Sequence, residues 1–255
     1  MPERVAQDLH TGYYVYGVVS AAEGVRPSLR GIDDAEVEFV EYGDLAAAVA
    51  EIALDRPPGR RAELMAHSAV VDALASAGAV VPVRFGSILE ERDSVVRDLL
   101  EMEHDRLVDL LERLKGTRQL NLRATYVQEQ VLAEVVRANP EVAELRRRTR
   151  DLPEGTMHPD LVRLGELVAR VMETKRDEDA GTILTAVRPL ILDEAVRKGG
   201  GVDHVLDVAL LVEDARVPEL EDALETLAEA VHERLRLRLT GPVAPYDFAE
   251  AEGWD

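Results

Sequence analysis

Histidines are the residues of this chain best suited to binding a metal or moving a proton, and their spacing argues against both. No two of them stand two or four residues apart, the spacings that put two imidazoles on one face of a strand or helix. The six are His10, His67, His104, His158, His204 and His232. The chain has no cysteine, which excludes thiolate catalysis and cysteine-ligated zinc or iron–sulfur sites. We therefore predict no metal site and no cofactor.

Neighbouring polar residues offer no better case for catalysis. Ser68 follows His67, but adjacent residues on a helix point about 100° apart and cannot share a proton. The acidic pairs Asp33-Asp34 and Glu90-Glu91 are typical of turns and helix starts, where carboxylates favour the positive end of the helix dipole. With no pair of titratable groups at workable spacing, we predict that the protein is not an enzyme.

The charge of the chain excludes one class of partner. Fifty acidic and 30 basic residues give a formal net charge of −20, and residues 1–117 and 118–255 each contribute −10. Nucleic-acid binding takes its affinity from cations that neutralise phosphates, so we predict no nucleic-acid partner. The densest basic run, residues 146–150, follows two glutamates and is typical of an exposed helix end. Contact with an acidic partner is the alternative interpretation of that run.

Hydropathy and cysteine content indicate the cellular compartment of the protein. The sequence never reaches the roughly 18 consecutive apolar residues of a membrane span, and its first residues lack the pattern of a signal peptide. The absence of cysteine fits a reducing compartment. We expect a cytoplasmic protein without membrane contact.

The elements that would position any site form an α+β fold of two domains. In residues 1–117, apolar and β-branched patterns predict strands over 13–19, 37–42, 45–52 and 80–85 and helices over 61–77 and 88–115. Residues 45–52 are alanine-rich, so a helix there is the alternative. Pro82 places its strand at a sheet edge or a ladder end. This order predicts a ferredoxin-like antiparallel sheet with one helix reduced or missing.

The second predicted domain, residues 118–255, again combines strands and helices. Strands are expected over 118–127, over 205–212 and from 235 onward. Helices are expected up to residue 150 with a restart at Pro140, over 161–197 and over 218–235. Residues 177–181 and Pro189 should divide or kink the helix over 161–197. The pattern predicts a ferredoxin-like α/β unit with inserted helices.

A basic patch follows from this second arrangement. The first and last strands of a ferredoxin-like unit are neighbours, so the outward-facing Arg123 should lie near Arg236 and Arg238 on the face without helices. We interpret this patch as a docking surface and add Arg84, in the strand over 80–85, as a fourth candidate partner-binding residue. The alternative is a solvated face whose arginines pair with nearby acids.

Four segments, in the expected order along nearly the whole chain, resemble the GvpF/GvpL gas vesicle family. They are Tyr14-Val-Tyr-Gly-Val-Val, His67-Ser68, Val80-Val-Pro-Val-Arg-Phe-Gly86 and Leu239-Thr-Gly-Pro-Val-Ala-Pro-Tyr-Asp-Phe248. Val243-Ala244 departs from the bulkier or proline residues expected there. The resemblance implies two domains, the first ferredoxin-like, and no catalytic residue or cofactor. It also implies a role in forming gas vesicles, with contact to the small hydrophobic shell protein and to other gas vesicle accessory proteins.

Physical chemistry narrows the role that this resemblance implies. Charges lose their hydration against gas, so a surface of −20 argues against wholesale exposure to the vesicle lumen. Open sheet edges suit a protein that holds an aggregation-prone, β-rich subunit. We expect an assembly or nucleation factor, with minor incorporation into the shell and self-association left open. The alternative function is a regulatory ferredoxin-like module that binds a small ligand.

Overall fold

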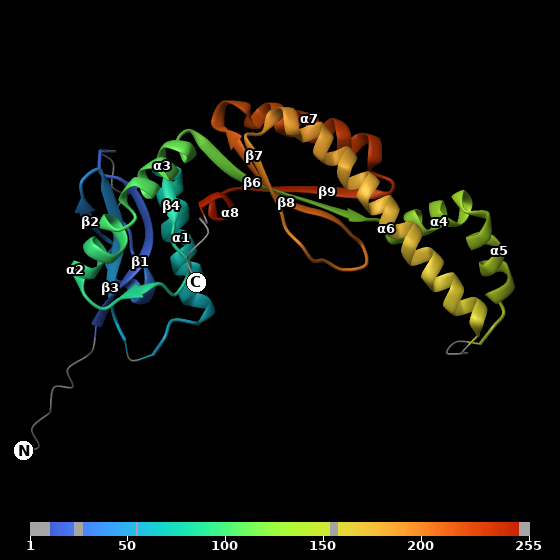
Figure 1. Ribbon diagram of the computed structural model, residues 1–255, viewed down its shortest axis with the longest axis horizontal. Coiled ribbons are helices and arrows are strands. Elements are labelled where there is room, and N and C mark those ends of the chain that lie inside the picture. Colours follow the sequence, from blue (N-terminus) through green and yellow to red (C-terminus); the bar gives the residue numbers. More distant parts are fainter. Residues whose placement is uncertain (1–10, 23–27, 55, 154–157, 250–255) are drawn as a thin grey trace, which may run out of the picture. The chain divides into compact units, whose positions relative to one another are not determined.

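The computed structural model describes residues 11–22, 28–54, 56–153 and 158–249 (Figure 1). Contacts divide the chain into two compact units, one of residues up to Gln119 with the segment from Pro242 onward, the other of Leu120–Gly241. Each unit has its own sheet and helices, which confirms the predicted α+β class. The domain boundary after residue 117 and the ferredoxin-like label remain predictions.

The first unit is built on a sheet with the strand order β2-β3-β1-β4, in which β5 also pairs with β1. Its strands are β1 (Thr11–Ser20), β2 (Glu38–Tyr42), β3 (Leu45–Ala53), β4 (Val80–Pro82) and β5 (Ile88–Leu89). The alanine-rich segment is therefore a strand, antiparallel to both β1 and β2. Its residues 45–50 are fully buried, and short alanine side chains let helices pack closely there. Pro82 ends β4 at a sheet edge, as predicted.

Helix α1 (Arg61–Ala77) has the predicted bounds, whereas the single helix predicted over 88–115 is wrong. Ile88 and Leu89 instead pair with β1 as β5. The helical part begins with α2 (Arg92–Ser94), continues as a π-helical stretch (Val95–Glu101) and resumes as α3 (His104–Leu114). The break comes at Glu103, which leaves the helical conformation at φ −106°, ψ 14°. Helical periodicity alone does not reveal a π turn, because the apolar stripe continues through it.

A buried histidine connects three segments of the first unit. The ring nitrogens of His67, on α1, lie 2.9 Å from the Tyr14 hydroxyl of β1 and 2.8 Å from the Tyr246 hydroxyl of α8 (Tyr246–Ala249). The Tyr14 hydroxyl also accepts a hydrogen bond from the backbone N–H of Gly86, at 2.9 Å. Burial lowers the pKa of His67 to about 4, against the opposing effect of a hydrogen bond to the Val83 backbone. The neutral imidazole therefore acts as a structural crosslink at neutral pH.

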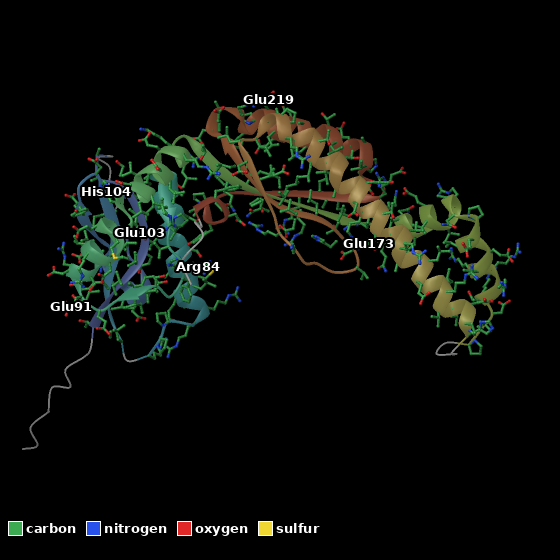
Figure 2. The ribbon with its side chains drawn as sticks, in the orientation of Figure 1. Arg84, Glu91, Glu103, His104, Glu173 and Glu219 are labelled. Atoms are coloured by element: carbon green, nitrogen blue, oxygen red, sulfur yellow. The ribbon has the colours of Figure 1, made fainter. Side chains whose placement is uncertain are left out.

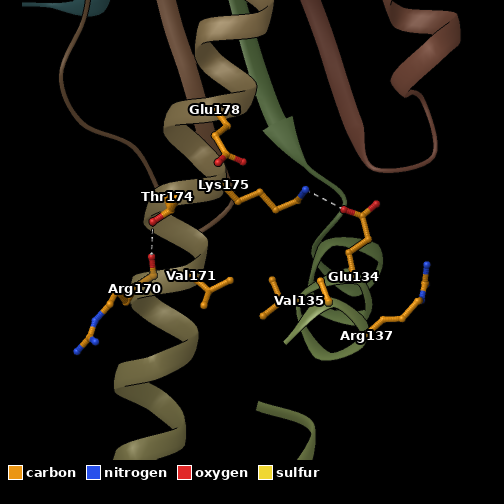
Figure 3. Close-up of a pocket in the computed structure, with 9 residues that line it drawn as sticks. Glu134, Val135, Arg137, Arg170, Val171, Thr174, Lys175 and Glu178 are labelled. Carbon is orange, nitrogen blue, oxygen red and sulfur yellow. Dashed lines mark hydrogen bonds and ion pairs between the residues drawn. The ribbon is translucent and has the colours of Figure 1, made fainter. Parts of the chain in front are cut away.

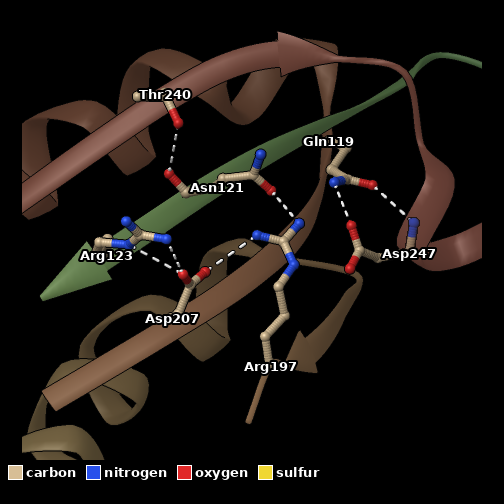
Figure 4. A network of polar contacts seen from close by, with 7 residues as sticks. All are labelled: Gln119, Asn121, Arg123, Arg197, Asp207, Thr240 and Asp247. Atoms are coloured by element: carbon tan, nitrogen blue, oxygen red, sulfur yellow. Dashed lines mark hydrogen bonds and ion pairs between the residues drawn. The ribbon is translucent and has the colours of Figure 1, made fainter. Parts of the chain in front are cut away.

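Helix α8 is held within the first unit by a second polar contact. Gln119 donates from its side-chain amide to the carboxylate of Asp247 at 2.6 Å, and its carbonyl oxygen accepts from the Asp247 N–H at 3.2 Å (Figure 4). Phe248 and Ala249 are buried. The segment that resembles the closing motif of the family is thus part of the packing of this unit.

The second unit has the sheet order β7-β8-β6-β9, with β6 and β9 adjacent. Its strands are β6 (Thr117–Tyr126), β7 (Asp193–Val196), β8 (His204–Glu213) and β9 (Leu235–Val243). Its helices are α4 (Gln128–Ala138), α5 (Pro140–Thr149), α6 (Pro159–Val187) and α7 (Val217–Val231). Figure 1 shows α6 and α7 along one side of the sheet. Alternate residues of β6 and β8 pack with these helices into one apolar core, so the opposite face carries the polar residues.

Two predictions for this unit are corrected. The helix predicted over 161–197 ends at Val187, and a short 3-10 turn contains Pro189, so the break predicted at this proline is confirmed. The helix predicted beyond it is wrong, because β7 follows there as an edge strand that the sequence pattern did not reveal. Residues 177–181 do not interrupt α6, because the buried Asp179 is hydrogen-bonded there by Tyr126 of β6 and by Arg234, the residue before β9. Among the described helices none combines the length and the apolar character needed to cross a membrane.

Candidate functional site

The open face of the second sheet carries a network of charged side chains (Figure 4). Asp207, on β8, receives hydrogen bonds from Arg123 Nε of β6 at 3.0 Å and from Arg197 Nη1 at 3.1 Å. Arg197 also donates to the side-chain oxygen of Asn121 at 2.8 Å. Burial alone raises the pKa of Asp207, but the two guanidinium groups outweigh it and hold the pKa below its usual value. The carboxylate is charged at neutral pH and orders two arginines side by side.

Two contacts fix the register of β6 against β9. The N–H of Val127 donates to the Arg234 carbonyl at 2.9 Å, and the Thr240 hydroxyl donates to the Asn121 carbonyl at 3.4 Å. Thr240 lies six residues after Arg234, and Asn121 lies six residues before Val127, so the strands are antiparallel. In this register Arg238 stands opposite Arg123. Like charges directly opposite one another destabilise a sheet.

Arg236 and Arg238 complete the basic patch. Both are exposed and alternate along β9 with leucines that face the core. Within the described part of the chain neither has an ion pair or a hydrogen bond from its side chain. The sequence placed Arg123, Arg236 and Arg238 on one face, and the structure does the same; whether they bind a partner stays a prediction. Arg84 is exposed in the first unit, where it lies beyond the end of β4 and in no strand, so it is not part of this patch (Figure 2).

Two members of this network, Arg197 and Asp207, are not revealed by the sequence pattern. Arg197 fell inside the helix predicted over 161–197, although the glycines at 199–201 signalled a turn just beyond it. Asp207 interrupts the most apolar strand of the chain, and an acid inside such a run is the signal that could have found it.

A groove lies on the opposite face of the sheet, the face that α7 covers, beside β9. Its floor is apolar and its rim carries two glutamates, Glu221 and Glu225, that project from α7. The apolar lining comprises Leu120, Leu122, Leu224, Ala228, Leu237 and Leu239, around a volume of about 310 Å³. β9 has β6 on one side and no strand on its other side among the described residues. The groove therefore runs beside an edge strand.

A larger hollow of about 690 Å³ lies between α4 and α6 (Figure 3). Val135 and Val171 face it, and Lys175 crosses it to an ion pair with Glu134 at 3.0 Å. Arg137 and Arg170 also line it. A charged rim over apolar walls has the general character of a small-ligand pocket.

The family model for gas vesicle synthesis protein GvpL/GvpF matches residues 12–250, nearly the whole chain. The chain belongs to the GvpL/GvpF family. Relatives with both names are similar to it. Gas vesicle protein F of Streptomyces sp. (strain CB03234) is 33% identical over 240 residues, which cover 93% of this chain and 99% of the relative. Gas vesicle protein L of the same strain is 32% identical and covers 92% of each chain.

Solved structures of the GvpL/GvpF family share the fold. Gas vesicle protein GvpF from Anabaena sp. PCC7120 superposes with a TM-score of 0.82 at 21% identity, over 95% of this chain and 100% of the other. GvpF from Microcystis aeruginosa gives a TM-score of 0.77 at 20% identity, over 94% and 99%. Membership in the family makes this chain a gas vesicle-associated protein.

Proposed function

We propose that this chain is an assembly or nucleation factor of gas vesicles that binds the small hydrophobic shell protein in water and keeps it from aggregating. It acts in the cytoplasm and offers a surface to other proteins, without catalysing a reaction and without a cofactor. Other accessory proteins of the vesicle are its further partners. The feature that carries the proposal is the edge of β9, with an apolar groove on one side and a basic sheet face on the other.

The hydration of charged side chains supports a protein that stays in water over one whose surface faces the gas. The surface of the described units carries many acidic side chains, among them Glu91, Glu103, Glu173 and Glu219 (Figure 2). Removing ionised groups from water costs several kcal/mol for each group without a partner. A minor structural role in the shell is compatible with this cost only where the acidic surface remains hydrated.

Backbone chemistry supports the choice of partner. An unpaired strand edge takes up an extended segment through main-chain hydrogen bonds, which do not depend on sequence, and adjoining pockets select side chains. A hydrophobic, β-forming subunit awaiting assembly exposes such segments and aggregates through them. Covering one of them would keep the subunit soluble until a shell takes it up.

Light scattering during dilution of denatured shell protein tests the proposal. With this chain at equimolar amounts we expect the scattering to be strongly suppressed, and an unrelated acidic protein of similar size and charge serves as the control. Equal scattering with both proteins would refute the proposed function.

A second candidate function is regulation by a small ligand, which the hollow between α4 and α6 favours. Thermal-shift screening of metabolites tests it. A ligand that raises the melting temperature in the wild type, but not in a Val171→Trp variant that fills the hollow, would support this function, provided that the chain also ignores the shell protein.

A further inference from the structure

We propose that β9 is a docking strand for an extended partner segment whose side chains alternate between apolar and acidic residues. The inference deepens the proposed function and rests on it in one respect, that the partner is a protein that supplies a strand. Three features of the second unit carry it: the free backbone edge of β9, the apolar groove under α7 and the arginines on the open face.

The free edge presents the backbone groups of the leucines. In an antiparallel pair, every second residue exchanges its N–H and C=O with the neighbouring strand. The bond from Val127 to the Arg234 carbonyl sets this phase, so the backbone groups of Arg236 and Arg238 point toward β6. Those of Leu237 and Leu239 point to the edge, where no strand of the described chain pairs with them. An added strand would bind these groups.

The groove selects the side chains on one face of the added strand. A residue directly opposite Leu237 or Leu239 would lie on their side of the sheet, which faces α7. Leu224 and Ala228 provide apolar contact there, and the rim glutamates Glu221 and Glu225 repel an acidic residue. Apolar side chains therefore suit these positions.

The sheet face without helices selects the side chains at the intervening positions of the added strand. Residues opposite Arg236 and Arg238 would lie beside two exposed guanidinium groups that have no partner within the described residues. Arg123 adds a third positive charge across the sheet, and its pairing with Asp207 leaves Arg238 without an acid of its own. Carboxylates at these positions gain attraction and relieve the opposition of Arg123 and Arg238.

A second copy of the chain is a poor occupant of this edge. If two β9 strands paired antiparallel, the arginines of both copies would share one face and stand across from one another, which destabilises the pair. The added strand therefore comes from another protein, and self-association does not use β9.

Fluorescence anisotropy with the full-length chain tests the inference. The probe is a labelled nine-residue peptide in which valine and glutamate alternate, and a peptide with the same residues in two blocks is its control. We expect the alternating peptide to bind at least tenfold more tightly. N-methylation of its valines, whose amides face β9, should abolish binding, whereas N-methylation of its glutamates should preserve it.

Charge reversal on the protein completes the test. Arg236→Glu with Arg238→Glu should lower the affinity for the valine–glutamate peptide about tenfold. The same variant should bind a valine–lysine peptide more tightly than the wild type does. Arg61→Glu with Lys115→Glu, at exposed positions at the start of α1 and just after α3, changes the net charge equally and should leave binding unchanged. Equal affinity for all peptides, or an equal effect of both double variants, would overturn the inference.

The two proposals fail separately. If the wild-type chain suppresses aggregation of the shell protein but ignores the alternating peptide, the docking strand is wrong and the assembly role stands. If it binds the peptide at β9 but leaves shell aggregation unchanged, the proposed function is wrong and the strand preference stands for another partner.

Discussion

Arg234 donates two hydrogen bonds to Asp179, at 2.6 and 2.7 Å, and so ties the residue before β9 to the C-terminal half of α6. The Tyr126 hydroxyl donates a third bond to the same carboxylate at 2.8 Å. Burial alone raises the pKa of Asp179, but the bonds from Arg234 and Tyr126 outweigh it and keep the pKa below its usual value. The docking strand thus begins at a fixed point of the core.

Asp179→Asn should destabilise the second unit by about 3 kcal/mol, because it leaves the Arg234 guanidinium without its counter-charge in a largely buried place. The contribution of this carboxylate is present above its unfolded pKa and is lost as the pH falls through its lower folded value. Urea unfolding of wild type and variant measures the loss. Asp177→Asn, at an exposed position on the same helix, is the control, and an equal effect of both changes would contradict the anchoring role.

His67 gives the first unit a pH dependence of its own. Its folded pKa of about 4 lies below the ordinary value near 6.5, so the unfolded chain binds the extra proton between these values. The free energy of unfolding should therefore fall by about 2–3 kcal/mol as the pH drops from 6.5 to 4. This loss adds to the one that protonation of carboxylates causes. His67→Gln should flatten that part of the profile. Parallel profiles for wild type and variant between pH 4 and 6.5 would contradict this account.

Tyr246 tests the attachment of α8. Tyr246→Phe removes the hydroxyl that contacts His67 and should cost about 1 kcal/mol. Hydrogen exchange should rise in α1 and stay unchanged in α6 if the segment belongs to the first unit alone. Faster exchange in α6 with unchanged exchange in α1 would show that the segment stabilises the second unit instead.

Much of this architecture could be predicted from the sequence because its signals are local. The alternation of Leu235, Leu237 and Leu239 with arginines predicted a strand, as did the alternation in β6. The expectation that the first and last strands of the unit are neighbours placed Arg123 near Arg236 and Arg238. The helix over 61–77 follows directly from its apolar spacing and its closing glycine.

The failures come from contacts that no local pattern carries. β7 has four residues, two of them acidic, and becomes a strand only by pairing with β8. Asp179 signals a break in a helix by itself, but its partner Tyr126 lies 53 residues before it and its partner Arg234 lies 55 residues after it. The groove beside β9 needs α7 and two strands together, so only the folded unit shows it.

Counting gas vesicles by electron microscopy, in a vesicle-forming cell from which this gene has been deleted, tests the proposed role in vesicle assembly. We expect few or no intact vesicles, recovery on return of the wild-type gene, and poor recovery with the Arg236→Glu, Arg238→Glu form at equal protein level. Normal vesicle numbers in the deletion strain would contradict a role in assembly.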